Sequence, residues 1–256
     1  MKGGMVPVAA CLLVMVLGSM GSVCCDSIFD KSRGPFQQRG YQLVVDVSSP
    51  VTAKQWSCLR GQLEVYQVIV RAWRSLGTMD ANANATIAAA HAAGIDKVDV
   101  YMFPCIKCLQ FEQQVDGMLL GLETSKYDRV WLDVEGVQYW TSSCDTNLQY
   151  FEELMAILVQ RLGVTRVGVY VSPTSWKALM CDYYTPFSSV VPLWYPHYDN
   201  NYGFQDFPPA GYGGWSHPSI KQYLGSASAC DASIDISSKF VLNPYPNPPS
   251  ASPLAS

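Results

Sequence analysis

The sequence is poor in charge and in histidine, and both shortages exclude classes of function. Charged residues make up only 15% of the 256 residues and hydrophobic residues 49%, a balance that excludes an intrinsically disordered chain. The 17 basic and 21 acidic residues give a formal net charge of −4, which argues against nucleic acid as a partner. The three histidines, His91, His197 and His217, fall in separate segments, so no zinc site built from them is expected.

Several common catalytic motifs are missing as well. There is no Gly-x-Ser-x-Gly, which excludes the usual nucleophile elbow of the α/β-hydrolases. There is neither a Walker sequence nor the glycine pattern of a dinucleotide-binding domain. No cofactor is therefore expected.

No segment of the sequence is long and apolar enough to be a membrane span. The apolar run from Val6 to Leu17 is shorter than the ~20 residues that a span needs. It follows Lys2 and precedes small residues, as in a cleaved signal peptide, so residues 1–22 are assigned to a signal peptide and 23–40 to a lead-in segment. The Pro- and Ser-rich residues 241–256 are expected to be a disordered tail. We predict a monomer without a membrane anchor, either secreted or in the lysosomal or phagosomal lumen.

Six of the nine cysteines lie in the body of the chain: Cys58, Cys105, Cys108, Cys144, Cys181 and Cys230. Exported proteins form disulfides, so we predict that these six are bridged. A C-x-x-C such as Cys105 to Cys108 can also be a redox motif or half of a zinc site, but no second C-x-x-C follows. Spacing alone does not choose among the possible pairings.

Short β-branched and apolar runs alternate with helical patterns along the body. The strand-like runs are Leu43–Val47, Val65–Arg71, Lys97–Phe103, Arg129–Glu135, Val167–Val171, Ser189–Tyr195, Ile220–Leu224 and Ser233–Ile236. The helical patterns are Asn84–Ala93, Gln113–Glu123, Thr146–Leu162 and Ser175–Met180. This alternation is typical of parallel βαβ units. We predict an α/β fold, a modified TIM-like (β/α) barrel with eight strands whose last strands lack full helices. A doubly wound open sheet is the alternative.

Four acids lie at, or just before, the C-terminal ends of these runs: Asp46, Asp133, Glu135 and Asp235. Side chains alternate along a strand, so Asp133 and Glu135 share one face, roughly 6.6 Å apart. In a barrel that face points to the axis, and the C-terminal mouth holds the chemistry. Oxygen ligands would suit calcium or magnesium, but we expect no metal and favour acid–base chemistry. One carboxyl with a raised pKa beside an ionised carboxylate is the machinery of glycoside cleavage.

Aromatic residues near the same strand ends favour a sugar as the substrate. They are Tyr101, Trp194, Tyr195, Tyr198 and Tyr223. An aromatic face stacks on the C–H face of a pyranose, and a tyrosine hydroxyl reaches the oxygens of the sugar. His197 lies among them and is a further candidate for lining the site. A structural hydrogen-bonding role for His197 is the alternative.

A series of short motifs resembles a known family. In order they are Val45-Asp46-Val47-Ser48, Asp99-Val100-Tyr101-Met102-Phe103-Pro104-Cys105, Trp131-Leu132-Asp133-Val134-Glu135-Gly136, Leu193-Trp194-Tyr195-Pro196-His197-Tyr198, Gly213-Gly214-Trp215, Ile220-Lys221-Gln222-Tyr223 and a final Asp235. Taken in this order, they resemble the glycoside hydrolase family 25 lysozymes of the Chalaropsis type, especially the amoeba- and nematode-like branch. The resemblance covers residues 41–240, which would form the catalytic domain. Pro196 and Asp231 depart from many relatives, which have Ala and Gly there.

The resemblance implies a modified α/β barrel that hydrolyses the β-1,4 bond between N-acetylmuramic acid and N-acetylglucosamine in bacterial peptidoglycan. It implies that Glu135 is the general acid and that Asp133 positions or activates the acetamido group of the substrate. Such participation would make cleavage substrate-assisted and retaining. Asp46 and Asp235 would line the same site, with the role of nucleophile left open. Gln222 joins the aromatic residues and His197 as an expected substrate-binding residue.

Two other functions remain alternatives at this stage. One is a non-catalytic protein that binds cell-wall glycans, although a pure binder has no need of two crowded carboxylates. The other is a glycosidase that acts on a different N-acetylated glycan, such as chitin.

For the disulfides, we expect the pairs Cys105–Cys108, Cys181–Cys230 and Cys58–Cys144.

Overall fold

The computed structural model describes residues 40–108 and 110–241. The predicted signal peptide lies outside these described residues, as do the lead-in segment before Gly40 and the tail after Val241. Within the described ranges, no helix combines the length and the apolar character that a membrane crossing requires.

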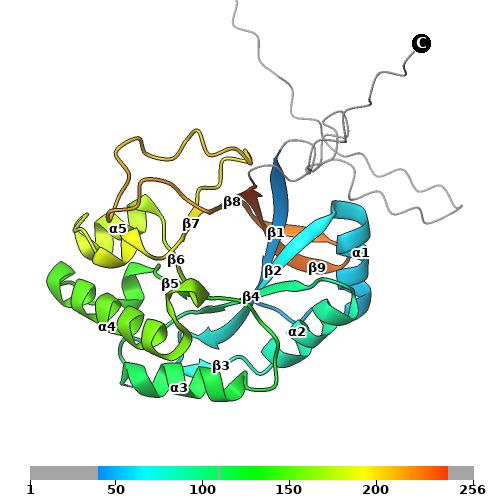
Figure 1. The fold of residues 1–256 in the computed structure, drawn as a ribbon, viewed down its shortest axis with the longest axis horizontal. Coiled ribbons are helices and arrows are strands. Elements are labelled where there is room, and N and C mark those ends of the chain that lie inside the picture. Colours follow the sequence, from blue (N-terminus) through cyan, green and yellow to red (C-terminus); the bar gives the residue numbers. More distant parts are fainter. Residues whose placement is uncertain (1–39, 109, 242–256) are drawn as a thin grey trace, which may run out of the picture. The chain divides into compact units, whose positions relative to one another are not determined.

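Among the described residues, nine strands form one sheet, and all but one of them close into a barrel (Figure 1). The barrel strands are β1 (Tyr41–Val47), β2 (Val65–Arg74), β4 (Lys97–Met102), β5 (Val130–Asp133), β6 (Val167–Tyr170), β7 (Leu193–Pro196), β8 (Ile220–Ala229) and β9 (Ala232–Phe240). The ninth, β3 (Thr78–Met79), only extends β2. Pairing between β1 and β2 closes the ring, so the predicted barrel is confirmed and the open doubly wound sheet is excluded.

One barrel strand runs against the others. From β1 through β2 and β4 to β8, neighbouring strands pair in parallel, whereas β9 pairs antiparallel with both β8 and β1. The reason is the two-residue turn between β8 and β9, Cys230 and Asp231, which both have positive φ, 52° and 58°. Such a turn can only make a hairpin, because a parallel crossover needs a dozen or more residues. The parallel βαβ pattern therefore does not extend to β9.

In the part of the chain that the structure describes, five α-helices pack outside the barrel: α1 (Ala53–Leu63), α2 (Ala83–Ala92), α3 (Phe111–Gly121), α4 (Cys144–Leu162) and α5 (Pro173–Met180). The helical patterns predicted α2 to α5 to within a few residues but missed α1. Only Trp56 and Leu59 of α1 are buried, so its apolar stripe is weak. Its start carries a signal all the same: Thr52 and Gln55 form a capping box.

The connection between β7 and β8 has no helix, as predicted for the last strands. A buried ion network holds this segment instead. Lys221 of β8 has no exposed side-chain surface, and its Nζ donates to Asp199 Oδ2 at 2.8 Å and to Asp206 Oδ1 at 2.7 Å. A third bond goes to the carbonyl of Gly203 at 3.1 Å. Because a buried ammonium needs such partners, the network fixes the connection on the barrel wall.

All six cysteines predicted to be bridged form disulfides, in the pairs Cys58–Cys230, Cys105–Cys108 and Cys144–Cys181. The expected pairs Cys181–Cys230 and Cys58–Cys144 are therefore wrong. Cys58 lies on α1, which contacts the β8–β9 turn through a bond from Gln55 Nε2 to the Asp231 carbonyl. Cys144 is the first residue of α4 and Cys181 directly follows α5, and the two helices are in contact. The first pairing depends on α1, the helix that the sequence analysis missed.

Large side chains fill the barrel. The core cluster comprises Val44, Ile69, Trp131, Tyr170, Trp194 and Ile220, with Tyr101 packed against it. Gly168 of β6 makes room for Trp131, because a Cβ at this glycine would lie 2.4 Å from Trp131 Cε3. The barrel therefore has a closed aromatic floor, and any site at its C-terminal mouth is open on one side only.

Candidate active site

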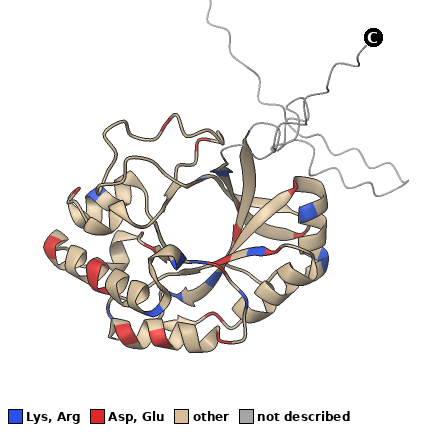
Figure 2. Ribbon diagram, in the orientation of Figure 1, with Lys and Arg blue, Asp and Glu red and all other residues tan. Residues whose placement is uncertain are grey.

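Strand alternation brings a ring of polar side chains to the C-terminal mouth of the barrel. Val44, Ile69 and Trp131 point inward, so the residues two positions further along the same strands point inward too. Asp235 joins this ring because it lies directly opposite Asp46 in the β1–β9 pair. The ring, here called the mouth layer, consists of Asp46, Arg71, Tyr101, Asp133, Tyr170, Gln222 and Asp235. Acidic residues occur on the strands within the ring as well as on the outer helices (Figure 2).

Asp46 is fixed by a hydrogen-bonded network around Gln222. The Nε2 atom of Gln222 donates to both carboxylate oxygens of Asp46, at 3.0 and 2.9 Å. Its Oε1 accepts from the hydroxyls of Tyr170 at 2.7 Å and Tyr198 at 2.8 Å. The pKa of Asp46 lies well above its ordinary value because of burial first and the nearby Asp235 second. Gln222, expected to bind substrate, is thus occupied in holding Asp46.

Asp133, at the end of β5, has a buried oxygen that accepts no hydrogen bond from the described part of the chain. The residue is 4% exposed, and its buried Oδ1 has no hydrogen-bond partner among the described residues. Burial raises its pKa well above the ordinary value, and the nearby carboxyls of Glu135 and Asp46 raise it further. An unpaired buried acceptor costs free energy. Asp133 Oδ1 is therefore a prepared acceptor for a donor brought by a ligand.

Glu135 follows two residues later and is partly buried. Burial raises its pKa, and the charge of Asp235 raises it further. Its backbone is held in place, since Trp140 Nε1 donates to the Glu135 carbonyl at 3.2 Å and the chain turns at Gly136 with φ 69°. A carboxyl that keeps its proton above the ordinary range is suited to act as a general acid.

Tyr101, Tyr198 and Tyr223 lie near these acids. Tyr101 belongs to the mouth layer, and its pKa is raised well above the ordinary value, first by burial and then by Asp133 and Asp46. Tyr198 and Tyr223 line a cavity of about 330 Å³ together with Asp235. All three therefore lie where a bound sugar could reach them.

Trp194 lies deeper, in the barrel floor. It is 2% exposed, and its Nε1 donates to Ser237 Oγ at 3.1 Å, two residues below Asp235 on β9. Tyr170 packs on it, with ring centroids 4.6 Å apart. Trp194 thus supports the mouth layer from below.

Tyr195 and His197 are not brought to the acids. The hydroxyl of Tyr195 donates to Asp206 Oδ2 at 2.9 Å, and His197 Nδ1 contacts the same oxygen. Asp206 is bound to Lys221, which points outward because its neighbour Gln222 points inward. His197, Asp199 and Asp206 are close enough together to hold a metal ion, but the ammonium of Lys221 already bonds both carboxylates.

The sequence analysis missed four residues of the site: Arg71, Phe103, Tyr139 and Tyr170. Tyr170 and Arg71 end strand-like runs as the acids do, so the same positional argument could have found them. Phe103 and Tyr139 form an edge-to-face pair, with ring centroids 5.0 Å apart, beside the turn that follows Glu135. No sequence signal singles out that pair, because it joins two loops.

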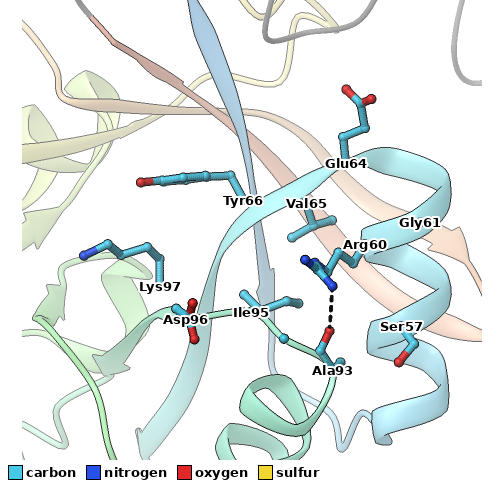
Figure 3. A pocket seen from close by; sticks show the side chains of 11 residues that line it. Ser57, Arg60, Gly61, Glu64, Val65, Tyr66, Ala93, Ile95, Asp96 and Lys97 are labelled. Carbon is cyan, nitrogen blue, oxygen red and sulfur yellow. Dashed lines mark hydrogen bonds between the residues drawn. The ribbon is translucent and has the colours of Figure 1, made fainter. Parts of the chain in front are cut away.

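A cavity of about 640 Å³ lies at the other end of the barrel (Figure 3). Its lining includes the first residues of β2 and β4, which are the ends of these strands away from the acids. Arg60, Glu64, Asp96 and Lys97 give it both signs of charge, and Arg60 Nη1 donates to the Ala93 carbonyl at 3.3 Å. Nothing about this cavity resembles the acid-lined mouth.

Comparison with known proteins identifies the family. A family model described as Lysozyme-like protein 1 matches residues 37–223. Probable GH family 25 lysozyme 2 of Dictyostelium discoideum is 40% identical over 194 residues, which cover 75% of this chain and 88% of that protein. Counting factor 50 of the same organism is 32% identical over 197 residues, covering 75% and 63%. Lysozyme-like protein 5 of Caenorhabditis elegans is 30% identical over 197 residues, covering 75% and 88%.

Solved structures share the fold at low sequence identity. A family GH25 lysozyme from Aspergillus fumigatus aligns with a TM-score of 0.62 at 14% identity, covering 78% of this chain and 93% of that one. A muramidase from Trichobolus zukalii aligns with a TM-score of 0.60 at 16% identity, with the same two coverages. The chain therefore belongs to the glycoside hydrolase family 25 lysozymes, in the branch that includes the amoeba and nematode proteins.

Proposed function

We propose that this lysozyme hydrolyses the β-1,4 bond between N-acetylmuramic acid and N-acetylglucosamine in bacterial peptidoglycan, with Glu135 as general acid and Asp133 as the group that engages the substrate acetamido. The observation that carries this assignment is the pair itself. Asp133 offers a buried oxygen to which no described residue donates a hydrogen bond, and Glu135, two residues on, has a raised pKa. Family membership supplies the reaction class.

In the first step, Glu135 gives its proton to the glycosidic oxygen as the bond from that oxygen to the sugar C1 breaks. The acetamido oxygen of the same sugar forms the new bond to C1, while Asp133 Oδ1 accepts the acetamido N–H. In the second step, Glu135 takes a proton from water, whose oxygen attacks C1 and displaces the acetamido oxygen. Two inversions give net retention, as in other substrate-assisted glycosidases.

Burial, the neighbouring carboxyls and the substrate set the protonation of the two carboxyls. After burial, Glu135 and Asp46 raise the pKa of Asp133, and Asp235 raises that of Glu135, so the free enzyme keeps protons in the site above the ordinary carboxyl range. An acetamido N–H on Asp133 favours the ionised form of Asp133. The proton then remains on Glu135, where the reaction needs it.

Asp46 and Asp235 take supporting roles in this proposal. Asp235 helps to keep Glu135 protonated, and Asp46 raises the pKa of Asp133. Tyr101, Tyr198 and Tyr223 are the sugar contacts. Trp194, Tyr195, His197 and Gln222 act indirectly, since the first three hold the barrel floor and the β7–β8 connection, and Gln222 holds Asp46.

The three disulfides are those expected in an oxidising compartment. We place the enzyme outside the cell or in the lysosomal or phagosomal lumen, where it would meet bacterial cell walls as a monomer.

The test is loss of turbidity of a peptidoglycan suspension across acid to neutral pH, with mass spectrometry of the reducing ends released. Wild type should clear the suspension and leave muramic acid at the reducing end. Glu135→Gln should abolish clearing, because it keeps the shape but has no proton to give. Glu123→Gln, an exposed glutamate on the outer surface, is the matched control and should clear normally.

Three results would contradict the proposal. Binding to cell walls without clearing at any pH would favour the non-catalytic glycan binder. One observation favours this alternative: the relative Counting factor 50 is not named as a lysozyme. Cleavage of chitin oligosaccharides in preference to peptidoglycan would favour the other glycosidase. Clearing that survives Glu135→Gln would mean that another group is the acid.

A further inference from the structure

Arg71 is the one basic side chain of the mouth layer. It lies on β2 two residues beyond Ile69 of the core cluster, so its side chain faces the same interior. It pairs in register with Tyr101 on the neighbouring parallel strand β4. The positive charge of Arg71 is close enough to affect the site, because it lowers the pKa of Tyr101. Burial has the larger, opposite effect on that pKa. The other charged members of the layer are all carboxylates.

The guanidinium of Arg71 is held in one orientation and still has a donor to offer. Nε donates to Asp80 Oδ2 at 2.8 Å, and Nη2 donates to the Ser48 carbonyl at 2.7 Å. Within residues 40–108 and 110–241, Nη1 has no hydrogen-bond partner. The Asp80 side chain is 6% exposed, whereas that of Arg71 is 28% exposed. The anchored part of the ion pair is therefore buried, and the arginine end meets solvent.

Tyr101 adds a second donor beside Arg71. Burial keeps its pKa well above the ordinary value, so the hydroxyl keeps its proton at any working pH. No described residue hydrogen-bonds to that hydroxyl. The β2–β4 side of the mouth thus offers two fixed donors, one of them charged, while the carboxylates lie on β1, β9 and at the end of β5. A ligand with an acidic group would be repelled by the carboxylates and attracted to this side.

We propose that Arg71, with Tyr101 beside it, binds a carboxylate on the lactyl arm of N-acetylmuramic acid. The inference rests on the proposed function and adds the basis of its substrate choice. N-acetylglucosamine has no lactyl arm, so glycans made of it alone, such as chitin, cannot make this contact. The carboxylate has two sources. It is the lactyl carboxylate itself where the stem peptide has been removed, and an acidic residue of the peptide where the stem is present.

The test uses three soluble glycans of equal length with alternating N-acetylglucosamine and N-acetylmuramic acid. The first has free lactyl carboxylates, the second has these capped as methylamides, and the third has intact stem peptides. Wild type should show a KM for a carboxylate-bearing glycan about tenfold or more below that for the capped glycan, with similar kcat, because a charge-assisted hydrogen bond is lost. Preference for the first glycan identifies the lactyl source, and preference for the third alone identifies the stem peptide.

Arg71→Gln removes the charge and the Nη groups but keeps a polar side chain of similar width. It should raise KM for the preferred glycan about tenfold to a hundredfold and raise KM for the capped glycan much less. Arg74→Gln, three residues along the same strand and exposed, is the matched control and should change neither. An equal loss on all glycans would mean that Arg71 is only structural and would overturn the inference.

The wild-type comparison does not depend on the folding of any variant, so equal KM for all three glycans would overturn the inference by itself. That result would leave the proposed function standing, because the glycans would still be cleaved. If wild type cleaves none of the three glycans and does not clear peptidoglycan, the proposed function fails, and the inference fails with it.

Discussion

Asp46 and Asp235 lie directly opposite each other across the antiparallel pairing of β1 and β9. Like charges in this position are destabilising, since the Cβ atoms of opposed residues are about 4.5–5.5 Å apart. Asp235 is also the second cause, after burial, of the raised pKa of both Asp46 and Glu135. One carboxylate on the reversed strand thus acts on the proton affinity of two others.

Asp235→Asn should therefore change the pH dependence of activity. Removal of its charge lowers the pKa of Glu135 toward the ordinary value, so the general acid loses its proton at a lower pH. We expect the basic limb of the pH profile of kcat/KM to move to lower pH, with several-fold less activity near neutrality than at the acidic optimum. Asp96→Asn, an exposed aspartate, should leave the profile in place. An unmoved basic limb in Asp235→Asn would show that Asp235 does not act on Glu135.

Ionised Asp133 should lower the free energy of unfolding, although the proposed reaction needs its carboxylate. Its pKa is raised in the folded state, so between its unfolded and folded pKa values the native state binds more protons and stability falls as pH rises. Asp133→Asn removes the buried charge and should raise the free energy of unfolding at neutral pH by roughly 1–3 kcal/mol. The gain should disappear below the ordinary aspartate pKa, where both forms are neutral.

Chemical denaturation of wild type and Asp133→Asn at pH 7 and at acid pH measures this difference. Activity should be lost in the same variant, since an amide cannot take the role of the carboxylate. A variant less stable than wild type at pH 7 would show that Asp133 is paired in solution and is not the open acceptor described here.

The barrel and the acids were predictable because both depend on local patterns. β-branched runs mark the eight barrel strands, and the position of Asp46 or Asp133 at a strand end is visible in the sequence itself. Asp235 is different. It lies near the start of β9, and it reaches the mouth only because that strand is reversed. Its expected position at the C-terminal end of a strand is therefore wrong, and its role at the mouth stays a prediction.

The errors concern contacts between distant segments. Successive side chains of a strand point to opposite faces, so Trp194 points inward and Tyr195 points outward. The sequence alone does not show which of the two neighbours faces the barrel axis. Tyr195 and His197 were therefore grouped with the acids, although they bind Asp206 on the outer wall. The disulfide pairing failed for a similar reason, because it depends on how α1 meets the β8–β9 turn.

Gly168→Ala should destabilise the barrel. The added Cβ would lie 2.4 Å from Trp131 Cε3, and the indole cannot move freely because its Nε1 donates to Asp99 Oδ2 at 2.8 Å. Overpacking of this kind costs about 1–3 kcal/mol. Gly61→Ala is the control, since nothing lies within 4 Å of a Cβ there and alanine favours the helix α1. Thermal melting should show a lower Tm for the first and an equal or higher Tm for the second. Equal Tm values for Gly168→Ala and wild type would mean that Trp131 repacks without cost.

Lys221→Met should loosen the β7–β8 connection. The variant keeps the bulk of the side chain but leaves Asp199 and Asp206 without the ammonium that both carboxylates bind. Breaking a buried pair from one side costs about 3 kcal/mol or more, so Tm should fall and proteases should cut within residues 197–219. Lys54→Met, at an exposed position on α1, should change neither. If Lys221→Met melts like wild type and resists the protease, packing of the aromatic residues alone holds the segment, and the ion network adds nothing to its stability.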